Sequence, residues 1–389
     1  MGKVRVVVRL RPDGGQSVCG VYGGAKGCHA TSVVVGQTPF DFDAAFGATS
    51  TQADVYAATA APLVSRVLNG RNGTVLAYGP TGTGKTHTVL GREGEPGLLP
   101  LVLDATFAAV RAERAAGVHV RVVVSYLEVY NEAVRDLFAD DPTAELAVRA
   151  DPKGGVKVVG LSEVECADAA DAADCVAVGT AARTAGATGA NANSSRSHAI
   201  FEVRVETRAK GSATTASGRL LVVDLAGSEC AERTGAFAEG SARRLEAQSI
   251  NQSLLALGQV ITALASKKGG HVPFRDSKLT RLLHDSLGGS AETVLVACIS
   301  PGADARDETL STLRYADKAR CIESQDRAHV APPRAPDAET LAAAERALSD
   351  AEEAIEAATL RLAEETALLE ASINDAVSAH VVETAPSTI

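Results

Sequence analysis

The stretch Gly79–Thr86 reads GPTGTGKT and directly follows the apolar run Val75–Tyr78, VLAY. It fits the pattern G-x-x-x-x-G-K-[ST], in which glycines let backbone N–H groups turn inward around phosphate oxygens. A helix that begins at the end of this loop would add its partial positive charge. Lys85 is placed to reach the β- and γ-phosphates, and the Thr86 hydroxyl is placed to ligate Mg²⁺. By itself this stretch predicts only a nucleotide site.

The surrounding chain predicts an α/β layered domain with a central mixed sheet. Leu220–Leu225 is apolar enough to be buried on both faces. Between 250 and 264 the aliphatic residues recur at spacings of four, three, four and three, which predicts an amphipathic helix. Apolar runs alternating with helical patterns favour this layered class. The expected strands are Val4–Arg9, Thr74–Tyr78, Val120–Val129, Leu220–Leu225 and Val294–Ile299.

Two polar segments accompany the phosphate loop. Asn191–His198 reads NANSSRSH and leads into a strand-like run, AIFEVRVE. Asp224–Glu229 reads DLAGSE and follows the buried run, where an acid of the Walker B type and a γ-phosphate sensor belong. In this order, the three segments resemble the phosphate loop, switch I and switch II of kinesin motor domains.

The resemblance to kinesins extends over nearly all of residues 3–322. The further matching segments are VRVVVRLRP at 4–12, DFDAAFG at 41–47, SYLEVYNEAVRDL at 125–137, DPKGGVKVVGL at 151–161, SINQSLLALGQVITALA at 249–265, HVPFRDSKLTRLLHDSLGG at 271–289 and ETLSTLRYADKARCI at 308–322. The resemblance implies the P-loop NTPase kinesin motor fold, with a central mixed, mainly parallel sheet flanked by helices and followed by a C-terminal helix. It also implies an ATP hydrolase that uses ATP/ADP and Mg²⁺ and moves along microtubules.

Carried over by position, the resemblance assigns a role to each site residue. Nucleotide-binding residues would be Arg9, Pro12, Gly79, Pro80, Thr81, Gly82, Thr83, Gly84, Lys85, Thr86 and His87, with Arg9, Pro12 and His87 flanking the adenine. Catalytic residues would be Lys85, Ser194, Ser195, Arg196, Gly227, Glu229 and Asn251. Thr86 and Ser195 would ligate Mg²⁺ directly, and Asp224 through water. Arg196 and Glu229 would form an ion pair that closes the site, and Glu229 would relay a proton.

The resemblance also places a track-binding surface. Tubulin presents an acidic surface, so a partner needs local positive charge. The cationic residues in the matching region are Lys267, Lys268, Arg275, Lys278 and Arg281. After the final helix of the motor, Glu323–Pro332 would act as a lever whose position C-terminal to the motor suggests plus-end-directed movement. Kinesins commonly have Lys-Asn where this chain has Glu323-Ser324, which predicts docking weaker by about one hydrogen bond, ~0.5–1.5 kcal/mol.

The sequence divides into a motor domain at 1–322, a neck linker and Pro-rich linker at 323–336, and an acidic Ala/Glu/Leu-rich helix at 337–380. In the last part, aliphatic residues recur every seven positions, which predicts either a dimerising coiled coil or a single acidic helix. These residues are Leu341, Leu348, Ile355, Leu362 and Leu369.

Charge and composition exclude other function classes. Residues 331–389 hold 12 acidic and 3 basic side chains, so the totals of 48 and 38 leave 36 acidic and 35 basic residues before them. The globular part is therefore close to neutral, which argues against nucleic-acid binding. No apolar run approaches the ~20 residues of a membrane-spanning helix, and the seven cysteines form no C-x-x-C pair. We therefore expect a protein of the cytoplasm and cytoskeleton that binds neither nucleic acid nor membrane.

A second function remains open from the sequence: a non-motile microtubule-binding protein with slow or no ATP turnover. Pro80 stands where kinesins usually have Gln, and it removes a side-chain amide and a backbone N–H from the loop. A microtubule-depolymerising kinesin and a C-terminal minus-end motor are disfavoured, because the motifs begin at residue 3.

Overall fold

The structure is a computed structural model of the chain. It describes residues 2–12, 17–22, 30–141, 143–151, 155–185, 195–209, 214–229, 241–266, 270–325 and 328–331, and five isolated positions between 346 and 361; side chains are described for 252–266 but not for 241–251. The chain divides into two units, Met1–Pro332 and Pro333–Ile389. The predicted helix at 337–380 lies almost entirely outside the described residues, and nearly all the described residues belong to the first unit.

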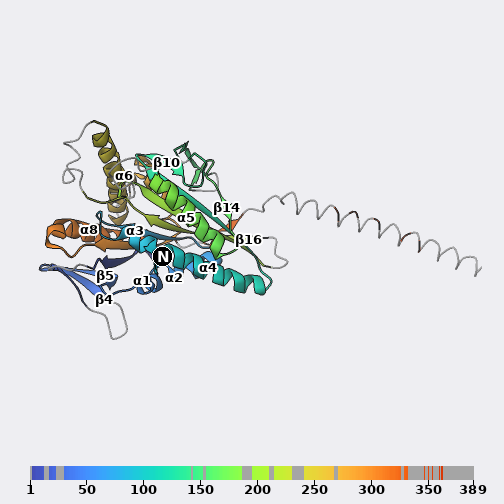
Figure 1. Cartoon of the computed structure of the whole chain (residues 1–389), viewed down its shortest axis with the longest axis horizontal. Helices are drawn as coiled ribbons and strands as arrows, with labels where there is room; N and C mark the ends of the chain where they lie inside the picture. Colours follow the sequence, from blue (N-terminus) through green and yellow to red (C-terminus); the bar gives the residue numbers. More distant parts are fainter. Residues whose placement is uncertain are drawn as a thin grey trace, which may run out of the picture. The chain divides into compact units, whose positions relative to one another are not determined.

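A central mixed sheet runs through this unit in the order β11-β10-β9-β15-β16-β6-β17-β2-β5-β4-β3 (Figure 1). Its middle strands, from β16 through β6, β17 and β2 to β5, pair in parallel, and the flanking strands pair antiparallel. This confirms the predicted fold class. The strands are β1 Gly2–Lys3, β2 Arg5–Leu10, β3 Cys19–Tyr22, β4 Ala30–Val35, β5 Thr38–Phe46, β6 Gly73–Tyr78, β7 Gly91–Arg92, β8 Glu95–Pro96, β9 His119–Tyr130, β10 Ala133–Asp136, β11 Glu145–Leu146, β12 Val148–Ala150, β13 Val156–Val158, β14 Val164–Glu165, β15 His198–Arg208, β16 Thr215–Asp224, β17 Glu292–Ile299, β18 Glu323–Ser324 and β19 Val330–Ala331.

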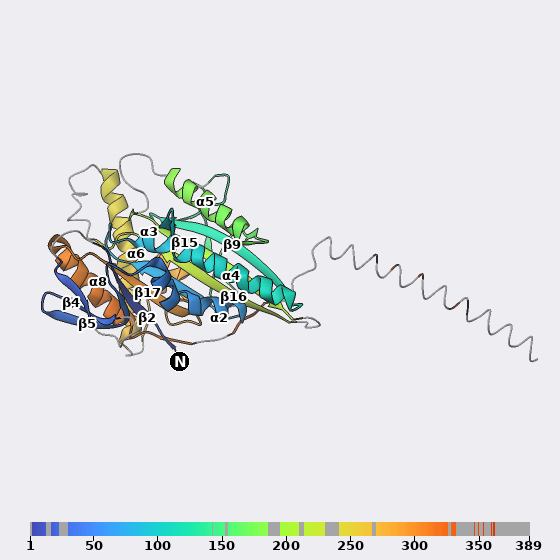
Figure 2. The ribbon, with the colours of Figure 1, turned by 60° about the horizontal axis from the view of Figure 1, so that its bottom comes forward.

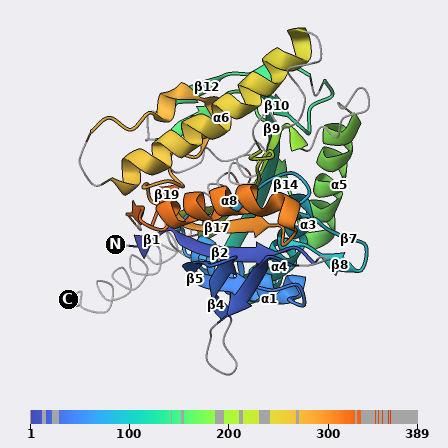
Figure 3. The ribbon, with the colours of Figure 1, turned by 90° about the vertical axis from the view of Figure 1, so that its left-hand side faces the viewer.

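Helices cover both faces of the sheet, as expected when interior strands are apolar on both sides. On one face, α2, α4 and α5 pack on the strands around Val75, Val122 and Val222 (Figure 2). On the other face, α6, α7 and α8 pack around Leu76 and Leu295 (Figure 3). The helices are α1 Gln52–Ala58, α2 Ala61–Leu68, α3 Lys85–Val89, α4 Leu98–Ala115, α5 Ala169–Ala185, α6 Ser241–Ala265, α7 Lys278–Leu282 and α8 Arg306–Ala319.

The central strand β6 explains where the phosphate loop lies. All six of its residues are buried, and its register sets Val75 opposite Val222 of β16 and Val294 of β17. In a parallel sheet, the carboxyl ends of neighbouring strands meet at one edge, and ligands bind there. The loop after β6 and the acidic segment after β16 are therefore brought together at this edge.

The predicted amphipathic helix at 250–264 is confirmed as the second half of α6. Leu257 and Ile261 are fully buried, while Leu254 and Leu264 pack at the margin of the same core. Within the described residues, no helix is both long enough and apolar enough to span a bilayer.

Candidate functional site

The phosphate loop leaves β6 through a turn that only glycine can make. Gly79 has φ 147°, and a Cβ there would stand 2.1 Å from the Cys298 carbonyl oxygen. Gly82 and Gly84 also have positive φ, so the backbone curls before α3 begins at Lys85. The loop thus keeps its amide groups on the inside of a tight curve, which is the arrangement that receives phosphate oxygens.

Lys85 is buried against its own loop. Its ammonium donates to the carbonyl oxygens of Gly79 and Pro80, both at 2.9 Å. Burial lowers the pKa of Lys85, and the nearby Asp224 carboxylate opposes that shift. An ammonium has three hydrogens, so one remains for a ligand oxygen. Pro80 contributes through its carbonyl, which does not depend on the N–H that proline lacks.

Thr86 and Asp224 form the candidate metal site. The Thr86 hydroxyl donates to Asp224 Oδ2 at 2.9 Å, and Asp224 lies at the carboxyl end of β16 with 2% of its side chain exposed. The other carboxylate oxygen, Oδ1, is buried and has no hydrogen-bond partner among the described residues. Oxygen donors of this kind are what Mg²⁺ prefers, so the residues present fit this ion.

Arg183 of α5 reaches the same carboxylate, and the sequence analysis missed it. Its Nη1 lies 2.9 Å from Asp224 Oδ2, and its Nη2 donates to the Ser197 carbonyl at 3.0 Å. A second buried carboxylate, Glu128 of β9, lies 3.8 Å from Arg183 Nε. Arg183 therefore neutralises two buried acids next to the candidate metal site. Its sequence neighbours in AARTA carry no motif, so only the topology reveals it.

His198 ties the two switch segments together beneath the site. Its Nδ1 accepts a hydrogen bond from the Ala226 amide at 3.0 Å, which places the ring hydrogen on Nε2, 2.8 Å from the Ser253 hydroxyl on α6. Burial lowers the pKa of His198 to about 3, and the charges of Arg183 and Lys85 act in the same direction. The imidazole is therefore neutral, and it connects β15, switch II and α6.

Switch II contacts the phosphate loop through backbone and side chain. The Ser228 amide donates to the Gly79 carbonyl at 3.1 Å, and the Gly227 amide donates to the Ser195 carbonyl at 2.9 Å. The Glu229 carboxylate accepts from the Thr81 amide at 2.8 Å and also from the Thr81 hydroxyl. These contacts place Ser228 and Glu229 on the loop and Ser195 beside Gly227, while the catalytic roles of these residues stay a prediction.

Arg196 lies within the described residues, one position before the buried Ser197. Its ion pair with Glu229 stays a prediction, since the Glu229 carboxylate rests on Thr81.

The residues expected at the adenine are joined by one further residue that sequence reasoning missed. Gln52, the first residue of α1, accepts from Arg9 at 2.7 Å and donates to the His87 carbonyl at 2.7 Å. Burial lowers the pKa of both Arg9 and His87. Pro12 is exposed two residues beyond β2. Gln52 follows the helix cap Thr51, and that cap was the one sequence signal near it.

The structure describes only some of the other predicted site residues. Ser194, Lys267 and Lys268 lie outside the described residues, and only the backbone of Asn251 is described, within α6.

On the expected track-binding surface, Arg275 is exposed. Lys278 Nζ lies 3.9 Å from a Glu145 carboxylate oxygen, and Arg281 donates to the Val148 carbonyl at 3.0 Å. The three residues lie in or beside α7, so the structure brings this part of the cluster together.

Sequence comparison identifies close relatives of this chain. The family model described as kinesin motor domain matches residues 25–322. The chromosome-associated kinesin KIF4 of Xenopus laevis is 42% identical over 341 residues, which cover 83% of this chain and 27% of that protein. The kinesin-like protein KIF18B of Mus musculus is 46% identical over 288 residues, 73% of this chain and 34% of that protein. The chain thus matches about a quarter to a third of the length of these relatives.

Solved structures show the same fold at similar identity. The structure described as that of a fast kinesin superposes with a TM-score of 0.77 at 37% identity, covering 86% of this chain and 96% of that one. A KIF14 dimer bound to a microtubule with AMP-PNP superposes with a TM-score of 0.75 at 33% identity, covering 84% and 96%. Both likenesses extend over most of the described unit.

Proposed function

The chain belongs to the kinesin motor domain family, and from that premise we propose that it is a microtubule-stimulated ATPase that converts ATP hydrolysis into movement along microtubules. The observation that carries this proposal is the continuous contact between the phosphate loop and both switches. Switch II reaches the loop at Thr81 and Gly79, and it reaches switch I at Ser195. The loss of the γ-phosphate would therefore alter the contacts of both switches at once.

Nucleotide binding would use the groups already at the loop. The curled amides between Gly79 and Thr86 receive the phosphates, and the third hydrogen of Lys85 goes to a phosphate oxygen. Thr86, Ser195 and Asp224 would hold Mg²⁺, which when bound supplies charge neutralisation at the β- and γ-phosphates. Arg183 holds the Asp224 carboxylate in place for this role through an ion pair at 2.9 Å.

Phosphoryl transfer needs positioning and charge neutralisation more than covalent chemistry. We assign the orientation of the attacking water to Ser194, Ser195 and Asn251, and γ-phosphate sensing to the Gly227 amide. Glu229 would leave Thr81 to pair with Arg196 when the switches close, and would then relay the proton. Because this ion pair would form only in the closed state, it would couple ATP hydrolysis to the conformation of the switches.

The partner we propose is the microtubule, and the location we propose is the cytoskeleton, in the cytoplasm. Lys267, Lys268, Arg275, Lys278 and Arg281 would face the acidic tubulin surface. Lys278 and Arg281 each have a contact inside the domain, so we expect Arg275, which is exposed, to contribute more than either. Movement towards the plus end is part of the proposal, as is a homodimer through 341–369.

The test is the rate of ATP hydrolysis by the full chain with and without taxol-stabilised microtubules. We expect strong stimulation, and we expect Lys85→Ala to abolish turnover in both conditions. Wild-type hydrolysis that microtubules do not stimulate, combined with microtubule co-sedimentation, would replace the motor with the passive binder. Failure to co-sediment in any nucleotide state would overturn both.

A further inference from the structure

The segment after α8 lies along the sheet rather than apart from it. Its first residues form β18, which pairs with β1 near the N-terminus, and its last form β19, which pairs with the beginning of β16. Between them, the Gln325 amide donates to the Gly289 carbonyl at 2.7 Å and the His329 amide donates to the Gly70 carbonyl at 2.6 Å. The segment is therefore in a docked position.

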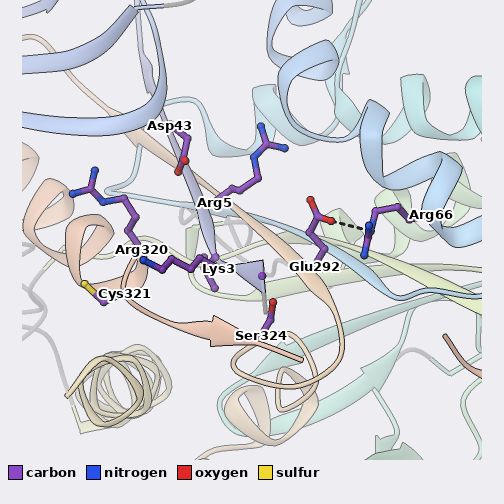
Figure 4. A pocket seen from close by; sticks show the side chains of 10 residues that line it. Lys3, Arg5, Asp43, Arg66, Glu292, Arg320, Cys321 and Ser324 are labelled. Carbon is purple, nitrogen blue, oxygen red and sulfur yellow. Dashed lines mark ion pairs between the residues drawn. The ribbon is translucent and has the colours of Figure 1, made fainter. Parts of the chain in front are cut away.

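The root of this segment lies beside a pocket at the surface of the domain. A cavity of about 810 Å³ lies beside the pairing of β1 with β18, lined by Lys3 and Ser324 and by the ion pair of Arg66 with Glu292 (Figure 4). The two-residue pairing of β1 with β18 consists of backbone bonds that any sequence could make. Farther along the segment, one described side chain contacts the body of the domain.

His329 is that side chain. Its Nε2 lies 2.8 Å from the Ser290 hydroxyl, which lies 2.6 Å from Asp285 Oδ1. Asp285 Oδ2 accepts from the Asn72 amide at 2.7 Å and from Arg219 at 3.3 Å. The chain of contacts thus runs from the docked segment into a polar cluster anchored on β16 and on the residue before β6.

The direction of each hydrogen bond follows from the acid at its end. Burial would raise the pKa of Asp285, but the bonds from Ser290 and Asn72 and the charge of Arg219 together lower it to about 2. The ionised carboxylate can only accept, so Ser290 gives it its single hydroxyl hydrogen. Ser290 can then only accept from His329. The ring hydrogen of His329 therefore lies on Nε2 and points at Ser290.

We propose that His329 is a positioning residue that latches the docked residues 328–331 by donating to Ser290, whose hydroxyl is fixed by Asp285. The inference rests on the proposed motor function, since it makes this latch part of the moving element.

Amide hydrogen exchange of the peptide covering 325–331 tests the latch in the full chain with AMP-PNP and Mg²⁺. His329→Ala removes one hydrogen bond, which should speed exchange of these amides about two- to tenfold. His329→Gln keeps an N–H donor at similar reach and should exchange within about twofold of wild type. His329→Glu offers only an acceptor beside the Asp285 charge and should exchange at least as fast as His329→Ala.

Two further variants test the role of Ser290 and provide a control for the loss of a histidine elsewhere. Ser290→Ala should reproduce His329→Ala, and the double variant should be no faster than either single one, because both remove the same bond. His119→Ala, an exposed histidine at the start of β9, should leave the peptide unchanged. Unchanged exchange in His329→Ala, or equal acceleration in His329→Gln, overturns the latch.

A second measurement separates this inference from the motor function. We expect His329→Ala to keep microtubule-stimulated ATP hydrolysis while microtubule gliding slows about two- to tenfold, in step with the lost latch. Wild type without microtubule stimulation would defeat the proposed function. Stimulated wild type whose gliding speed His329→Ala does not change would defeat the latch alone.

Discussion

Glu229 rests on Thr81 in this structure, so its carboxylate occupies an amide of the loop that Glu229→Ala would leave available. Glu229→Ala should therefore still bind ATP, while microtubule-stimulated turnover should fall about 100-fold or more because a group positioned for the transition state is missing. Binding of a fluorescent ATP analogue and steady-state hydrolysis measure the two properties. Glu93→Ala, on the exposed turn between β7 and β8, is the control. Wild-type turnover in Glu229→Ala would refute its role.

Arg183 is a buried counter-ion that we expect to contribute to the free energy of unfolding. Arg183→Ala would leave Asp224 and Glu128 buried without their cation, which should cost about 3–5 kcal/mol in the free energy of unfolding. Chemical denaturation measures this loss. Arg92→Ala breaks an exposed pair with Glu95 and should cause no measurable loss. A loss in Arg183→Ala as small as in Arg92→Ala would contradict the buried network.

His198 makes stability depend on pH. Its pKa of about 3 in the folded state lies below the value of about 6.5 in the unfolded chain. Between these values the unfolded state binds more protons, so this contribution is complete above pH 6.5 and shrinks as pH falls. From pH 7.5 to 5.5, wild type should lose about 1.4 kcal/mol more unfolding free energy than His198→Gln. His119→Gln is the control. Parallel pH profiles for wild type and His198→Gln would refute the buried neutral imidazole.

At the scale of elements, β16 and α2 are in contact at a point with no room for a side chain. A Cβ on Gly218 would stand 2.1 Å from the Val67 carbonyl oxygen. Gly218→Ala should therefore cost about 1–3 kcal/mol in unfolding free energy, through overpacking against a backbone that cannot move freely. The matched control is Gly258→Ala inside α6, where the nearest atom is a Tyr315 ring carbon at 3.7 Å. That variant should gain about 0.5–1 kcal/mol, and equal losses in both would contradict the contact.

The helices and strands also show which features of the structure could be predicted from the sequence. The strands around 75, 122, 222 and 296 could be predicted, because strands that are buried on both faces are continuous apolar runs. Asp224 and Glu229 could be placed because they follow such a strand directly. Arg183 and Gln52 could not be predicted, because each acquires its role only through a contact between elements that are distant in the sequence. Arg183 of α5 contacts Asp224 of β16, and Gln52 of α1 contacts His87 of α3. His329 and Ser290 were missed for the same reason.

At the scale of the whole molecule, the heptad repeat at 341–369 predicts a dimer that forms outside the described unit. Analytical ultracentrifugation of the full chain over a concentration series should show a monomer–dimer equilibrium. The reason is that the second core position of the heptad is occupied by alanines, Ala344, Ala351 and Ala358, which bury little area per turn. Leu348→Glu combined with Ile355→Glu should sediment as a monomer at every concentration. A wild type that stays monomeric throughout would favour the single acidic helix.

One strand, β16, connects the candidate metal site with the docked segment after α8. Its last residue, Asp224, belongs to the candidate metal site, and its first two residues, Thr215 and Ala216, pair with the docked β19. Ten residues of strand span about 30 Å. Strand β15 pairs with β16 along Ala216–Asp224, and β6 pairs with Leu220–Asp224, so the half of β16 next to the site is held on both sides. If β16 turned as a rigid unit, a rotation of about 10° at one end would displace the other end by about 5 Å. In the proposed motor, a small tilt of β16 would therefore be enough to connect a change at the nucleotide with the docked segment.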